Sequence, residues 1–198
     1  MMPVGASAGQ LPYDNLSVMG EEMYGIVSLL DEEHQLTVWE LWADIEREFG
    51  VKISETHVPH FSYHVATTYG DRIHELLDSI AAATTSVRTS CMIIGVFNFP
   101  PPLFFLPLAR TDALNALHRR LWTEVEPYAV NVIGPYYGAD MWMATVNLSP
   151  DIEKDISREL LQFLLQRDFQ WDLTVDNVCL LHDTGERQLL EARFELRG

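Results

Sequence analysis

Residues 58–63 read Val-Pro-His-Phe-Ser-Tyr and place an imidazole and a hydroxyl two positions apart, at His60 and Ser62. Their apolar and aromatic neighbours favour a strand, in which residues two apart point to the same face. An imidazole can move a proton near neutral pH, and a hydroxyl beside it can donate a hydrogen bond to a phosphoryl oxygen. Taken alone, such a pair more often fills an ordinary core or surface role, so the phosphate interpretation needs support from elsewhere in the chain.

A second stretch has the same layout. Residues 142–148 read Trp-Met-Ala-Thr-Val-Asn-Leu, an aromatic lead-in followed by two short polar residues at Thr145 and Asn147. Strand alternation again places these two side chains on one face, where a hydroxyl and an amide can donate hydrogen bonds to phosphoryl oxygens. We therefore predict that the two stretches meet at a common cleft. The side chains predicted to line it are those of His60, Ser62, Thr145 and Asn147.

The composition limits both the architecture and the partners. Of the 198 residues, 47% are hydrophobic and 11% aromatic, which is ample for a packed core and argues against disorder. The formal net charge is −16, with only 13 Lys and Arg residues. Because nucleic-acid backbones are gripped by clustered basic side chains, binding of long nucleic acid is not expected. A small phosphorylated ligand is compatible with this charge, since a few donors inside a pocket outweigh a distant screened field.

Further features concern the cell compartment and bound groups. No apolar run approaches the roughly 20 residues needed to cross a bilayer, and no secretory signal is visible, so no membrane contact is expected. Cys91 and Cys179 lie in apolar, strand-like runs without metal or redox spacing, and we expect buried free thiols in a reducing cytoplasm. No cluster of residues has metal-ligand spacing, so neither a metal nor another cofactor is expected.

The order of the predicted elements indicates an α+β chain. Residues 1–20 predict a flexible N-terminal arm, and residues 21–198 predict a single domain with two lobes. A strand, a helix and a strand with paired polar residues occur once in each half. Besides the two polar stretches, the predicted strands cover residues 23–30, 87–99, 103–108, 171–181 and 189–196. The predicted helices cover residues 37–49, opening on a capping box at Thr37 and ending before Gly50, and then 71–83, 111–125 and 149–164.

The stretch Pro59-His60-Phe61-Ser62-Tyr63 resembles the His-x-(Thr/Ser) element that occurs twice in the two-histidine (2H) phosphoesterase superfamily, which includes 2′-5′ RNA ligase-like proteins and cyclic nucleotide phosphodiesterases. The resemblance implies a bilobal α+β fold with two antiparallel-rich sheets, flanking helices and a central cleft. It also implies that the ligand is a small phosphoester, such as a cyclic nucleotide or an RNA end. It spans residues 23–196 through short segments: Tyr24-Gly25-Ile26-Val27, the helix of residues 39–49, Gly95-Val96-Phe97, Leu103-Phe104-Phe105-Leu106 and the helix around residues 114–118.

The second copy of this element departs from the family pattern. In the family it usually reads Trp-x-Pro-His-x-Thr-Leu, and Trp142 and Leu148 keep that register here. The family's proline, histidine and threonine are replaced by Ala144, Thr145 and Asn147. Sliding the alignment by two positions puts a methionine at the place of the histidine. Neither alignment restores an imidazole.

The lack of a second histidine at Thr145 bears on the chemistry of phosphoester cleavage. In-line attack needs a base at the entering oxygen and an acid at the leaving oxygen, and two imidazoles supply both. Each contributes about 10²–10⁴-fold, so the loss of one predicts weakened or lost hydrolase activity without loss of ligand binding. The resemblance then implies proton transfer by His60 and a hydrogen bond from Ser62 to the phosphate. Thr145 and Asn147 would be orienting donors.

Three functions remain open at this point. The chain is a divergent phosphoesterase, or it keeps the fold as a non-enzymatic binding or scaffold protein, which the missing imidazole and the acidic charge favour. A third possibility is that the acidic surface binds a protein partner, for which the sequence names no site. His57 can be judged as a substitute only with coordinates, whereas strand spacing puts His64 on the His60 face about 13 Å along the chain. A basic side chain such as Arg88 or Arg110 beside His60 would favour the phosphate interpretation, and a closed apolar cleft would favour a scaffold.

Overall fold

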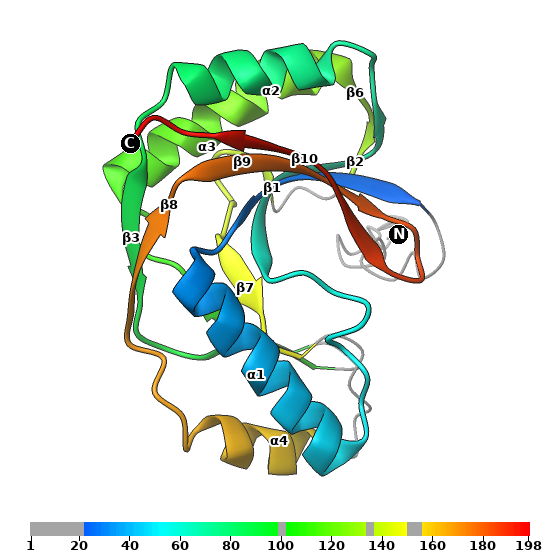
Figure 1. Cartoon of the computed structure of the whole chain (residues 1–198), viewed down its shortest axis with the longest axis vertical. Coiled ribbons are helices and arrows are strands. Elements are labelled where there is room, and N and C mark those ends of the chain that lie inside the picture. Colours follow the sequence, from blue (N-terminus) through cyan, green and yellow to red (C-terminus); the bar gives the residue numbers. More distant parts are fainter. Residues whose placement is uncertain (1–21, 99–101, 134–136, 150–155) are drawn as a thin grey trace, which may run out of the picture.

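Figure 1 shows the computed structural model, which describes residues 22–98, 102–133, 137–149 and 156–198. The predicted arm of residues 1–20 and the helix start predicted just after Ser149 lie outside the described residues. The elements in chain order are β1 (Met23–Leu29), α1 (Glu32–Phe49), β2 (His60–Tyr69), α2 (Ile73–Ala82), β3 (Val87–Cys91), β4 (Gly95–Phe97), β5 (Leu103–Pro107), α3 (Asp112–Val125), a 3₁₀ turn (Glu126–Tyr128), β6 (Ala129–Val132), β7 (Thr145–Asn147), α4 (Ser157–Leu164), β8 (Trp171–Val175), β9 (Asn177–Asp183) and β10 (Gln188–Glu195).

The described strands form two larger sheets and one short ribbon. The first sheet has the order β10-β9-β1-β2-β6, the second has the order β4-β5-β7, and β3 pairs with β8 in the ribbon. Neighbouring strands are antiparallel throughout these three units. Together with the four α-helices, this confirms the predicted α+β class with antiparallel sheets and flanking helices.

The helices divide between two sides of the five-stranded sheet. In Figure 1, α2 and α3 lie above that sheet, whereas α1 and α4 lie below it on the side of β7. Direct contacts of α3 with β2, and of α2 with β9 and β10, agree with this view. At the lower end, Phe49 of α1 meets the Phe163 ring of α4 edge-on, and Arg167 donates to Asp44 of α1 at 2.6 Å. Helices α2 and α3 therefore cover one side of the five-stranded sheet, and α1, α4 and β7 lie on the other side.

Helix α1 begins earlier than the capping box at Thr37 predicts. The N-cap is Asp31, whose carboxylate accepts the backbone N–H of His34 at 3.1 Å, and two glutamates follow in the first turn. A carboxylate N-cap and acidic first turn satisfy the exposed N–H groups and the helix dipole, so the helix starts there. The Thr37 hydroxyl instead donates to the Glu33 carbonyl within the helix. The predicted end at Gly50 is confirmed, with φ of 74°.

Some strand predictions need correction. The predicted strand of residues 171–181 is split at Asp176, so that β8 pairs with β3 while β9 joins the five-stranded sheet. The predicted strand of residues 87–99 is likewise interrupted at 92–94. Strand β6 was not predicted, because it is a largely exposed edge strand and lacks the apolar alternation that marks a buried one. In both split strands, a continuous apolar run passes from one sheet to another, which periodicity alone does not reveal.

One large apolar core joins the two sides of the molecule. Its members come from every helix and from strands of all three sheets, and they include Trp42 and Trp142, each 1% exposed. A smaller cluster, formed by Val27, Leu29, Cys179 and Leu181, lies separately from it on β1 and β9. Among the described residues, no helix is both long and apolar enough to cross a membrane.

Candidate functional site

The first polar stretch opens strand β2. His60 pairs with Leu29 and Ser62 pairs with Val27 on β1, and both polar side chains are half-buried. Phe61 between them is only 1% exposed and belongs to the large core. Because residues of a strand alternate between faces, His60 and Ser62 share the face that carries the smaller apolar cluster. The predicted placement of His60 and Ser62 on one face of the strand therefore agrees with the structure.

A bulge then changes the face on which the following residues of β2 lie. Ser62 is opposite Val27 and His64 is opposite Ile26, so one step along β1 corresponds to two steps along β2. The extra residue of β2 forms a bulge. His64 consequently turns toward α3, where its ring lies 4.7 Å from that of Trp122 and is fully buried. The prediction that His64 shares the face of His60 was wrong. It failed because a bulge inverts the alternation on which it relied.

The protonation of His60 is set by its own loop. Its Nδ1 lies 2.7 Å from the carbonyl oxygen of Val58. Because a carbonyl only accepts hydrogen bonds, Nδ1 carries the proton in the neutral ring and Nε2 keeps its lone pair. Burial lowers the pKa of His60 below its usual value, and repulsion from the His57 imidazole lowers it further. The ring is therefore neutral near pH 7 and suited to accept a proton at Nε2.

The loop before β2 is held from two sides. Glu46 of α1 accepts the backbone N–H groups of Ile53 and Ser54 at 2.7 and 2.8 Å. Partial burial raises the pKa of Glu46, but these hydrogen bonds outweigh it and the net direction is downward, so the carboxylate form is favoured. At the other side, the carbonyl of Thr56 accepts the backbone N–H of Gln188 at 2.7 Å. The loop that positions His60 is thus fixed to both α1 and β10.

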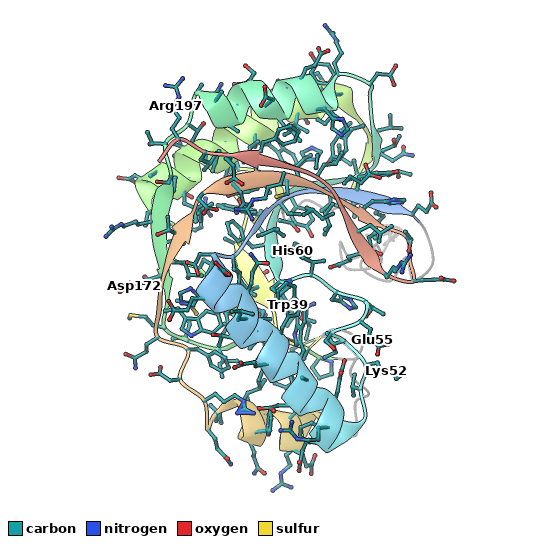
Figure 2. The ribbon with its side chains drawn as sticks, in the orientation of Figure 1. Trp39, Lys52, Glu55, His60, Asp172 and Arg197 are labelled. Carbon is teal, nitrogen blue, oxygen red and sulfur yellow. The ribbon has the colours of Figure 1, made fainter. Side chains whose placement is uncertain are left out.

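The second polar stretch reaches the first through Trp142. The Trp142 indole N–H donates to the carbonyl of Ser62 at 2.8 Å, and strand β7 contacts β2 directly. The indole also stacks on the His118 ring of α3, with centroids 4.0 Å apart and planes within 1°. Figures 1 and 2 show β7 beside the lower end of β2, where His60 lies. The two stretches therefore come together in space.

Thr145 and Asn147 lie on the same face of β7. Val146 between them is fully buried, whereas both polar side chains are half-buried. The Asn147 Oδ1 accepts the backbone N–H of Ser149 at 2.9 Å. The amide nitrogen of Asn147 carries two N–H groups that can donate to a ligand.

A cavity of about 150 Å³ opens beside Ser62 on the face of the five-stranded sheet. Its polar lining comes from Ser62, Asp183 and Gln188, and the rest is apolar or aromatic. His60, Thr145 and Asn147 are not among its lining residues. Sequence reasoning missed Asp183 and Gln188, because they come from the β9–β10 hairpin and no spacing connects them to Ser62. The complete lining is Met23, Tyr24, Gly25, Val27, Ser62, Val65, Tyr137, Leu181, Asp183 and Gln188.

The two arginines proposed as phosphate partners are engaged elsewhere. Arg88 lines a different cavity, of about 270 Å³, on the β3–β8 ribbon together with Asp172 and Thr174. Arg110 donates to the Asn115 side chain at 2.8 Å and to the Trp142 carbonyl at 2.9 Å. Within the described part of the chain, neither arginine lines the cavity beside Ser62.

His57 is the histidine that the sequence left open. Its Nδ1 lies 2.7 Å from the Thr56 hydroxyl, and its ring lies edge-on to Trp42 of α1 with centroids 6.3 Å apart. Its charge acts on the pKa of His60, after the larger effect of burial. A second imidazole therefore lies in the neighbourhood of His60, but on the preceding loop and not on β7. In the described residues, no group of three or more His, Cys, Asp or Glu side chains could hold a metal ion.

Two solved structures share this fold over nearly the whole chain. The crystal structure of TT0787 of Thermus thermophilus has a TM-score of 0.53 at 14% identity, and the match covers 89% of this chain and 98% of that one. The crystal structure of E. coli LigT complexed with 3′-AMP has a TM-score of 0.56 at 11% identity, with 90% and 99% covered. No family model matches the sequence, and no curated protein matches it.

Both structures are of 2H phosphoesterase superfamily proteins. The chain accordingly has the 2H phosphoesterase fold, as the resemblance of its first polar stretch implied. At sequence identities of 14% and 11%, this likeness concerns the fold alone.

Proposed function

We propose that this protein binds a small phosphoester, such as a cyclic nucleotide or an RNA end, in the cleft between β2 and β7. The observation that carries the proposal is the state of His60, whose Nδ1 is bound to Val58 and whose lowered pKa keeps Nε2 available as a base. The same fold in E. coli LigT was solved with 3′-AMP, a small phosphorylated ligand.

The roles of the four site residues follow from their chemistry. His60 accepts a proton from the attacking oxygen, and the Ser62 hydroxyl donates a hydrogen bond to a phosphoryl oxygen. The Thr145 hydroxyl and the Asn147 amide orient the phosphate from the other strand. Because threonine does not titrate near pH 7, the leaving oxygen lacks an acid from β7. Turnover is then slower by about 10²–10⁴-fold than with two imidazoles.

The second candidate is a binding protein without catalytic activity. One observation favours it: Thr145 stands where the family pattern has histidine. A binding protein needs the donors of Ser62 and Asn147 but not the proton transfer of His60. The two candidates therefore differ in whether a bound phosphoester is hydrolysed.

A pair of measurements separates the candidates. Hydrolysis of 2′,3′-cyclic nucleotides and 2′-5′-linked dinucleotides is followed with wild type and His60→Ala at high enzyme concentration. Turnover lost in His60→Ala supports the enzyme, whereas equal rates in both proteins remove the catalytic role. Calorimetric titration with 3′-AMP then tests binding, which Ser62→Ala should weaken. If wild type binds neither cyclic nor linear nucleotides, the phosphoester proposal is wrong.

We also propose that residues 21–198 act as one domain in the cytoplasm. The support for one domain is the core that joins helices and strands from both sides of the molecule. The support for a reducing compartment is that Cys91 and Cys179 are both buried and unpaired.

A further inference from the structure

The cavity beside Ser62 has a lining that does not suit a phosphate. Asp183 contributes a carboxylate, and the other polar groups are the neutral side chains of Ser62 and Gln188 and the hydroxyls of two tyrosines. A phosphate placed here would face the like charge of Asp183 without a compensating cation from the lining. We propose that this cavity is a subsite for a sugar ring with free hydroxyl groups and that it adjoins the phosphate position at Ser62. This inference rests on the proposed function, in which the phosphate of the same ligand lies toward Thr145 and Asn147.

Asp183 keeps acceptor capacity for such a ligand. Its Oδ1 accepts the backbone N–H of Gly185 at 3.0 Å, and its Oδ2 accepts from the Gln188 amide at 3.3 Å. A carboxylate offers about four lone-pair positions, so about two remain after these bonds. Hydroxyl groups of a ribose are suitable donors, and an acidic side chain is a common partner for them. The recognition is charge-assisted and therefore stronger than a neutral hydrogen bond.

The size and the remaining walls fit one ring. A cavity of about 150 Å³ is large enough for one benzene-sized ring, which suits a furanose but not an entire nucleotide. Val27, Val65 and Leu181 form apolar walls against which the C–H face of a sugar can pack. Burial raises the pKa of Tyr137, so its hydroxyl stays protonated and can donate to a sugar oxygen.

The backbone of one residue, Val58, connects this cavity to His60. The backbone N–H of Val58 donates to the Gln188 side-chain oxygen at 3.1 Å, while the Val58 carbonyl accepts from His60 Nδ1 at 2.7 Å. Gln188 in turn donates to Asp183. The acceptor that would hold the sugar and the ring that would take the proton are therefore fixed relative to each other. A sugar in the cavity would place its attached phosphate at a defined position beside His60.

The test uses the full chain and three probes: 3′-AMP, adenosine and inorganic phosphate, titrated calorimetrically. The variant is Asp183→Asn, which keeps the Oδ1 acceptor for Gly185 and removes the charge. The control is Glu186→Gln, which removes one carboxylate from the same turn outside the cavity. We expect Asp183→Asn to raise the Kd for 3′-AMP and adenosine about tenfold. Its Kd for inorganic phosphate should stay equal to that of wild type, and Glu186→Gln should match wild type for all probes.

The outcomes separate the subsite from the proposed function. If 3′-AMP binds equally to wild type and Asp183→Asn, the subsite is wrong while phosphoester binding stands. If adenosine binds as tightly as 3′-AMP and both weaken in Asp183→Asn, the subsite stands and the phosphate role of the cleft is wrong. An equal loss for phosphate and adenosine in Asp183→Asn, or no binding of any probe to wild type, overturns the subsite.

Discussion

At the scale of single residues, His60 and Ser62 share one face of β2, and Thr145 and Asn147 share one face of β7. Strand alternation is a local rule, so the sequence predicted both of these faces. It did not predict which nitrogen of His60 carries the proton, since the partner is a backbone carbonyl and no side-chain pattern marks it. Asp183 was also beyond prediction, because it reaches the cavity through the pairing of β9 with β1 and not through proximity in the chain. The strand faces of the candidate site residues were therefore predictable from the sequence, whereas contacts that depend on distant strands were not.

Thr145→His supplies the missing imidazole on β7. If the cleft holds a phosphoester between the two strands, this change should raise the rate of 2′,3′-cyclic nucleotide hydrolysis by about 10²-fold or more. Thr145→Asn, which offers hydrogen bonds but no titratable group, is the matched control and should not raise the rate. Combining Thr145→His with His60→Ala should cancel the gain. Equal rates for the His and Asn variants would show that β7 does not face the leaving oxygen.

The pH dependence of any hydrolysis reports on His60. Burial and the nearby His57 lower the pKa of His60 below the usual 6.5, so the neutral, proton-accepting form persists into mildly acidic solution. We expect kcat/KM to be level around neutral pH and to fall only below pH 6.5. The measurement is a kcat/KM profile with a 2′,3′-cyclic nucleotide. An acid limb with its midpoint above pH 6.5 would contradict this assignment of the base.

At the scale of elements, one bulge decides how β2 is used. Before the bulge, His60 and Ser62 lie on the face that carries the smaller apolar cluster, and after it His64 packs against Trp122 of α3. Helix ends, such as the one at Gly50, were predicted because their chemistry is local. The bulge was not, because it depends on pairing with β1. Contact between β2 and β7 likewise depends on Trp142, which bridges them from the side of α3.

Trp142→Phe tests this bridge. The substitution retains an aromatic ring beside His118 but removes the N–H that reaches the Ser62 carbonyl, which should lower the free energy of unfolding by about 1–3 kcal/mol. Urea denaturation of the variant and of wild type gives the difference. The control is Trp39→Phe on α1, where the ring is 37% exposed and a change within about 0.5 kcal/mol is expected. Similar losses for both variants would argue against a specific role for the indole hydrogen bond.

At the scale of the whole molecule, the side of the five-stranded sheet opposite His60 contains a buried aromatic layer. His64 and His118 are both fully buried there, and the His118 Nε2 lies 2.6 Å from the Tyr137 carbonyl oxygen. Since a carbonyl only accepts, Nε2 carries the proton in the neutral ring. Burial lowers the pKa of each to about 4. The fold is thus built around two imidazoles that must stay neutral.

Acid should therefore weaken the fold before carboxylates are protonated. Between about pH 6.5 and pH 4 the unfolded chain binds protons at His64 and His118 that the folded chain does not, so stability is complete above pH 6.5 and falls as the pH drops toward 4. With about 1.4 kcal/mol per pKa unit, each histidine accounts for roughly 3 kcal/mol across this range. Urea unfolding at about pH 7.5, 6 and 5 measures the slope. His64→Gln should flatten it, whereas His74→Gln on the exposed face of α2 should not; a slope unchanged in His64→Gln would refute this account.

Val58 gives the protein a built-in spectroscopic reporter, because its N–H and its carbonyl bond to different partners. Its amide proton senses the Gln188 side chain directly, and its carbonyl senses whether the imidazole of His60 is charged. In a ¹⁵N-labelled sample, the nuclear magnetic resonance signal of this single amide should therefore move both during an acid titration and when the β9–β10 hairpin responds to an added compound. One cross-peak would then report both the charge of His60 and a change at Gln188, without a label attached to the ligand.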